Sequence, residues 1–154
     1  MHVIWSLFFL LIICFIGFMT YRKTIKKIKF YKDFCFFCQT LQTHIVFFQN
    51  KIKDIILAQD FNGDFNEVLK GVLENNYQSL DNISYLKEDE KQEILLFFKK
   101  LGRANVETEK MEIQNFQKKK EEDLTTLKSI GLKNGKLKFS LTIMLGFFVF
   151  IIML

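Results

Sequence analysis

Three side chains in the first third of the chain are of types that bind metals or carry out redox chemistry. Cys35 and Cys38 form a Cys-x-x-Cys pair, and His44 follows six residues later. Six residues turn a helix by about 240°, so His44 points away from the cysteine pair. A zinc site generally needs four ligands, and a thioredoxin-type motif needs a strand–helix–strand setting that the sequence lacks. The pattern favours cysteines packed on an apolar face, with a metal or redox protein as the alternative that metal analysis decides.

A second pattern is similar to the start of a calcium-binding loop, because every second residue of Asp60–Asn66 is Asp or Asn. The sixth position holds Phe65 instead of Gly, and the twelfth holds Gly71 instead of Glu. An acidic turn is therefore favoured over a calcium site. No nucleophile–base pair, glycine-rich phosphate loop or pair of carboxylates stands in a usable context. We predict no catalytic residue, no cofactor, no metal site and no enzymatic activity.

Two apolar, uncharged runs at the ends of the chain, Val3–Met19 and Phe139–Leu154, determine the predicted architecture. Each is about long enough to cross the ~30 Å hydrocarbon core of a bilayer as a helix, the second only just. All 22 Lys and Arg and all 17 Asp and Glu lie between them, where the absence of Pro favours long helices. We predict an all-α protein, a helical bundle at residues 21–137 flanked by N- and C-terminal transmembrane helices at residues 1–20 and 138–154.

Basic residues beside these runs predict the orientation of the chain in a membrane. Six follow the first run before any acidic residue: Arg22, Lys23, Lys26, Lys27, Lys29 and Lys32. Four precede the second run: Lys128, Lys133, Lys136 and Lys138. Lys and Arg mark the cytoplasmic side, so we expect both termini outside and the domain in the cytoplasm. The first cluster is also of the kind that contacts anionic lipids, although topology alone accounts for it.

Apolar residues three or four apart predict that the first helix continues into the polar region. This stripe consists of Ile25, Ile28, Tyr31, Cys35, Cys38, Leu41, Ile45 and Phe48, widened by Phe30, Phe34 and Phe37. The Asp64-x-x-Glu67 spacing is that of a capping box, with Asp64 as the N-cap. The shorter predicted elements are helices at Asn50–Leu57, 64–75 and Glu88–Lys100 and a loop at Gln78–Ser84.

The next stretch predicts a turn followed by a long polar helix, residues 105–129. The structural turn consists of Leu101, Gly102, Arg103 and Asn105, because Gly is a natural helix stop and Asn a good N-cap. The helix has a thin apolar stripe of Val106, Ile113, Phe116, Leu124 and Leu127. Two i,i+4 ion pairs are predicted, Lys118/Glu122 and Lys119/Asp123. The partner face predicted on this helix consists of Lys118, Lys119, Glu121 and Glu122, and a solvated face without a partner is the alternative.

The second half of the sequence resembles the stage III sporulation protein AB family of endospore-forming bacteria. The resemblance lies in Leu101–Asn105, in Ile113 on the following helix, and in Ser140–Thr142 with Gly146 in the last apolar run. Asn105 stands where that family usually has Asp, and Thr142 stands in place of a Gly. The first half is similar mainly at Leu41–Ile45.

This resemblance implies a scaffold of the channel that joins mother cell and forespore, on the mother-cell side of the forespore envelope. Its implied partners are other proteins of the channel operon, including a secretion-type ATPase, together with the lipid bilayer. The implied cytoplasmic domain is similar to that of the type II secretion platform protein. Nothing in the sequence indicates a nucleic acid or a small-molecule substrate as partner. The alternatives are a membrane-anchored helical adaptor unrelated to sporulation and a holin-like membrane protein.

Overall fold

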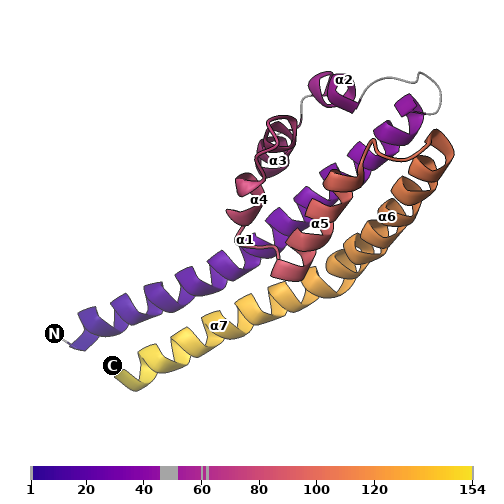
Figure 1. The fold of residues 1–154 in the computed structure, drawn as a ribbon. Helices are drawn as coiled ribbons and strands as arrows, with labels where there is room; N and C mark the ends of the chain where they lie inside the picture. Colours follow the sequence, from indigo (N-terminus) through magenta and orange to yellow (C-terminus); the bar gives the residue numbers. More distant parts are fainter. Residues whose placement is uncertain (1, 46–51, 60, 62, 154) are drawn as a thin grey trace. The chain divides into compact units, whose positions relative to one another are not determined.

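A computed structural model describes residues 2–45, 52–59, 61 and 63–153, with side chains except at residues 2–7, 9, 10 and 153. The stripe residue Phe48 and the predicted cap Asn50 lie outside these described residues, as do Asp60 and Asn62. The described chain is helical and contains no strand, so the all-α prediction is confirmed (Figure 1).

The helices belong to two compact units. The central unit is Lys29–Leu124, and the terminal unit combines Met1–Ile28 with Thr125–Leu154. The central unit is thus one continuous piece of chain, whereas the terminal unit is built from the two ends of the sequence.

Helix α1 (His2–Thr43) contributes its first part to the terminal unit and its second part to the central unit. Its continuation past the apolar run agrees with the lack of a breaker. Thr20 and Thr40 donate side-chain hydrogen bonds to carbonyl oxygens four residues earlier, at 3.0 and 3.1 Å. This bonding keeps their hydroxyl groups on the helix surface instead of breaking the helix. The predicted stripe residue Ile25 is 44% exposed, so the buried stripe begins later, at Phe30.

Four shorter helices follow in the central unit: α2 (Ile52–Leu57), α3 (Asp64–Leu73), α4 (Gln78–Asp81) and α5 (Glu88–Lys100). The predicted capping box at Asp64 is wrong. Gly63 is the N-cap of α3, and the Asp64 carboxylate instead accepts a hydrogen bond of 2.8 Å from the Tyr85 hydroxyl. The predicted loop at Gln78–Ser84 is also wrong, because burial of Leu80 and Ile83 winds its first part into α4.

The core of the central unit is a cluster of phenylalanines centred on α1. The Phe34 ring, fully buried, lies 5.3 Å from Phe97, 5.8 Å from Phe65 and 5.4 Å from Phe116 between ring centroids. Most of these pairs are tilted or edge-to-face, the arrangement that aromatic quadrupoles favour. Figure 1 shows α5 and α6 beside this part of α1, in agreement with these contacts.

The last helical stretch begins with α6 (Val106–Thr126), passes through the π-helical turn η2 (Leu127–Gly131) and ends with α7 (Leu132–Met153). Glycine and asparagine at Gly131 and Asn134-Gly135 predict a kink before the last apolar run. The structure has the π-helical turn end at Gly131, whereas Asn134-Gly135 is ordinary α-helix. Among the described residues, one helix is long and apolar enough to cross a membrane by length and composition, Val106–Ile152. The membrane helix at the N-terminus stays a prediction.

In the terminal unit, α1 and α7 run antiparallel, and the ends of the two helices that carry the chain termini lie together in Figure 1. The rings of Tyr21 and Phe139 stack with centroids 6.2 Å apart. Gly17 is buried where Phe139 and Thr142 approach, and an added Cβ would lie 3.2 Å from both. Small residues at such contacts allow helix backbones to come close together.

Candidate protein interaction surface

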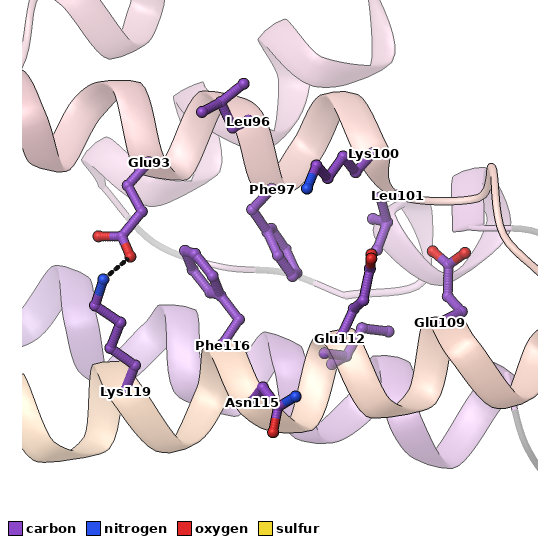
Figure 2. Close-up of a pocket in the computed structure, with 11 residues that line it drawn as sticks. Glu93, Leu96, Phe97, Lys100, Leu101, Glu109, Glu112, Asn115, Phe116 and Lys119 are labelled. Atoms are coloured by element: carbon purple, nitrogen blue, oxygen red, sulfur yellow. Dashed lines mark hydrogen bonds and ion pairs between the residues drawn. The ribbon is translucent and has the colours of Figure 1, made fainter.

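Helix α5 is positioned by signals at both of its ends. The Glu90 carboxylate accepts a hydrogen bond of 2.8 Å from the backbone N–H of Lys87, which satisfies one donor at the start of the helix. Acidic residues fill the first turn, and Lys99 and Lys100 fill the last, matching the helix dipole. The buried face consists of Ile94, Phe97 and Phe98. Glu93 points toward α6, and the exposed Leu96 lies at the edge of the hollow between the two helices (Figure 2).

The turn from α5 to α6 is held by a buried carboxylate. Gly102 adopts a φ of +79°, in the left-handed region that glycine tolerates best. The Glu109 carboxylate, 4% exposed, accepts hydrogen bonds from the backbone N–H groups of Gly102 and, at 3.3 Å, of Ala104. Asn105 caps α6, because its side-chain oxygen accepts a hydrogen bond of 2.8 Å from the N–H of Thr108. One end of α6 is therefore fixed against the end of α5.

Between the two helices lies an open hollow of about 410 Å³, which we call the α5–α6 groove (Figure 2). Its floor contains the rings of Phe97 and Phe116, stacked with centroids 4.5 Å apart. The other lining residues are Glu93, Leu96, Lys100, Leu101, Glu109, Glu112, Ile113, Asn115 and Lys119. An apolar floor with a charged rim is the usual composition of a surface that receives a side chain from another protein.

A cluster of charges closes one end of this groove. Glu93 on α5 accepts hydrogen bonds from Lys119 at 2.5 Å and from Lys120 at 2.7 Å. The Lys120 ammonium, 1% exposed, also lies 3.2 Å from Asp123 and 5.3 Å from the centre of the Tyr31 ring. A buried cation requires such partners, because its desolvation is costly. The cluster therefore ties α6 to both α5 and α1.

The cluster changes the acid–base behaviour of its members. Burial acts to raise the pKa of Glu93, but the hydrogen bonds from Lys119 and Lys120 outweigh it and hold this pKa below its ordinary value. The hydrogen bond to Glu93 raises the pKa of Lys119. Burial and then the charge of Glu90 strongly raise the pKa of the Tyr31 phenol. All three groups thus keep their usual charge states at neutral pH.

The structure brings together some of the partner-face residues predicted from the sequence. All four are exposed, and Lys119 lines the groove while paired with Glu93. Glu121 accepts a hydrogen bond of 2.7 Å from Gln117. Neither predicted i,i+4 ion pair forms among the described residues, and Lys119 pairs with Glu93 on α5 instead of with Asp123. Lys118 and Glu122 project from α6 without an ion pair in the described part of the chain.

Two buried charged residues of α6, Glu109 and Lys120, were missed by the sequence-based interpretation, which placed the run around Lys118 in solvent. Lys120 lies four residues from both Phe116 and Leu124, so it falls on the apolar stripe of the helix. Its position on this stripe was the feature of the sequence from which the burial of Lys120 could have been predicted. The partner that makes its burial tolerable, Glu93, is distant in sequence and gave no signal.

The cysteine pair lies in the core of the central unit. Cys35 and Cys38 are both buried, and burial strongly raises the pKa of the Cys38 thiol, which disfavours the reactive thiolate. Among the described residues, no group of three or more His, Cys, Asp or Glu is placed to hold a metal ion. The first basic cluster is divided between the units, with Arg22, Lys23 and Lys26 exposed in the terminal unit.

Comparison with protein families gives a match along almost the entire chain. The model of the family described as stage III sporulation protein AB matches residues 2–154. No curated protein and no solved structure gives a significant match to this sequence.

Proposed function

The chain belongs to the stage III sporulation protein AB family, and from this membership we propose that it is a scaffold of the channel between mother cell and forespore. Family membership implies a role in sporulation; the scaffold role is our proposal. In it, both ends of the chain cross the membrane of the mother-cell side, and the central unit lies in the cytoplasm. There it binds other channel proteins, including the secretion-type ATPase, and performs no catalysis.

The observation that carries this proposal is the position of the α5–α6 groove along the chain. Helix α6, which forms one wall of the groove, continues through η2 into the helix that is apolar enough to cross a membrane. A protein bound at α6 is thereby tethered to the membrane through the chain that follows α6. The exposed Leu96 beside the Phe97–Phe116 floor offers an apolar contact, and Lys118 and Glu122 offer charges that set specificity.

The experiment compares surface variants of the full-length protein in sporulating cells. Leu96→Asp disrupts the groove, and Met111→Asp is its matched control, since Met111 is exposed on α6 but does not line the groove. A double charge reversal, Lys118→Glu with Glu122→Lys, tests the charged face without removing any ion pair that the structure contains.

We expect Leu96→Asp and the double reversal to reduce co-purification of the ATPase and to lower spore yield. Met111→Asp should leave both unchanged, and all variants should keep the wild-type circular dichroism spectrum. Normal spore yield and co-purification in the first two variants would contradict a docking role for this surface. Normal spore yield after deletion of the gene would contradict the scaffold proposal itself.

A further inference from the structure

A second groove, of about 420 Å³, lies between α1 and α7 within the terminal unit. One end is lined by Thr20, Gly135 and Lys138, and the opposite end by Ile13 and Leu145. The order of these residues follows from the antiparallel contacts, in which Gly17 meets Phe139 and Thr142. The groove is therefore polar and cationic at one end and apolar at the other.

The walls of this groove are open to their surroundings. Ile16 is 57% exposed, Leu141 is 53% exposed and Leu145 is 60% exposed, although all three are large apolar side chains. They stand beside Gly17 and Gly135, where an added Cβ would lie 3.2 Å from Phe139 and 3.3 Å from Tyr21 respectively, so the two helices are in close contact next to these exposed walls. Exposed apolar walls of this kind require an apolar covering.

The charge of the terminal unit has a single sign. Its two segments contain no Asp or Glu and eight basic residues: Arg22, Lys23, Lys26, Lys27, Lys128, Lys133, Lys136 and Lys138. Lys138 is the last of these before the apolar run of α7 and itself lines the groove. Lys23 and Lys27 follow Thr20 by three and seven residues, so they lie on the same side of α1 as the groove. The polar end of the groove thus meets cations from both helices.

We propose that this groove binds one anionic phospholipid. An acyl chain occupies the apolar part between Ile13 and Leu145, and the headgroup phosphate lies at Lys138, on the side of α1 that carries Lys23. This inference rests on the membrane placement in the proposed function, because only a bilayer supplies such a ligand to this site. It goes beyond that proposal by assigning a defined lipid site and the sign of the headgroup charge.

Charge complementarity and the polarity of the groove select this occupant. A second copy of the chain would bring another eight cations to the same place, which like-charge repulsion opposes. A zwitterionic lipid would fill the apolar part but would gain less from the surrounding cations. Each Lys or Arg near an anionic headgroup contributes an attraction equivalent to about a fivefold change in binding.

The test uses the full-length protein in nanodiscs that contain equal amounts of phosphatidylglycerol and phosphatidylcholine with identical acyl chains. Lipids that stay bound after extraction into a mild detergent are quantified by mass spectrometry. Lys138→Gln removes the headgroup contact, and Ile16→Trp fills the groove from an exposed position. Lys110→Gln, an exposed lysine of α6 in the central unit, is the matched control for loss of one charge.

We expect the wild type and Lys110→Gln to retain phosphatidylglycerol at least fivefold over phosphatidylcholine. Lys138→Gln should lower this preference about fivefold, and Ile16→Trp should lose most of the retained lipid. Equal retention of the two lipids by wild type, or equal effects of Lys138→Gln and Lys110→Gln, would overturn the site. A lipid-free dimer that forms a disulfide in an otherwise Cys-free Leu141→Cys variant would also overturn it. Failure of the protein to enter the discs would contradict the membrane placement and the site together. Loss of the scaffold role in cells, by contrast, leaves these lipid measurements unaffected.

Discussion

Removing Glu93 from the Glu93–Lys120 ion pair should destabilise the protein far more than removing Lys120. Glu93→Ala leaves the Lys120 ammonium 1% exposed, with Asp123 at 3.2 Å as its one carboxylate in the described part of the chain. Breaking a buried pair in this way costs about 3 kcal/mol, at the lower end of the usual range because Asp123 remains. Lys120→Met removes the buried charge itself, and Glu93 keeps its contact with Lys119 at 2.5 Å. We expect that substitution to cost less than about 1 kcal/mol.

The double variant, Glu93→Ala with Lys120→Met, separates the cost of an uncompensated charge from the loss of the contacts themselves. With both partners replaced, no buried charge is left without its counterpart, so the double variant should resemble Lys120→Met and not the sum of the two single changes. The assay is hydrogen–deuterium exchange of α5 and α6 peptides in the full-length protein in detergent. Glu93→Ala should raise the exchange of these peptides roughly a hundredfold, as expected for about 3 kcal/mol of lost local stability. Strictly additive effects, with Lys120→Met as damaging as Glu93→Ala, would refute the assignment of this cost to an uncompensated buried charge.

Three further predictions concern the turn, the pH dependence and the topology. Gly102→Val should destabilise the central unit by more than ~1 kcal/mol because Gly102 has a positive φ, and Asn105→Ala should cost about 1 kcal/mol because α6 loses its cap. Both effects are measured by hydrogen–deuterium exchange of α6 peptides, and unchanged exchange would argue against this turn. Because the pKa of Glu93 is lowered in the folded chain, its stabilising contribution is complete above pH 4.5 and is lost as the pH falls through the lowered value. The thermal midpoint should therefore drop below pH 4.5 more steeply in wild type than in Glu93→Gln, and parallel curves would contradict this. In a Cys-free variant in intact cells, an impermeant maleimide should label a cysteine added after Leu154 but not one at Lys110; the opposite pattern would reverse the predicted topology.

Local signals in the sequence were sufficient for most helix boundaries. The acidic start and basic end of α5, the glycine at 102 and the cap at Asn105 all act within a few residues, so they can be recognised without knowledge of the fold. Phe30, Phe34 and Phe37 of α1 likewise reveal their burial by helical spacing. These features agree because propensity, capping and apolar pattern favour the same structure.

Features that depend on partners outside the local helix or cap pattern could not be predicted in this way. The Asp64 carboxylate has the spacing of a cap, but Tyr85 provides a hydrogen bond that no local rule includes. The burial of Glu109 depends on the backbone N–H groups of the preceding turn, and that of Lys120 on Glu93. The α5–α6 groove exists only because α5 and α6 pack against each other. For the candidate site, the charged rim was thus predictable in part. Phe116 lies on the predicted apolar stripe, but its stacking on Phe97 could not be predicted.

The contact between Lys120 and Tyr31 has a consequence for the order of folding. It holds the first and last helices of the central unit together, at 5.3 Å between the ammonium and the ring centre. The terminal unit must join segments separated by roughly 100 residues of flexible chain if it forms first, at an entropic cost of about 4 kcal/mol. Prior folding of the central unit removes most of that cost, because the intervening chain is already closed into a loop. A substitution that loosens the Lys120 contacts should therefore slow and weaken the pairing of α1 with α7 without altering any residue at which those two helices meet.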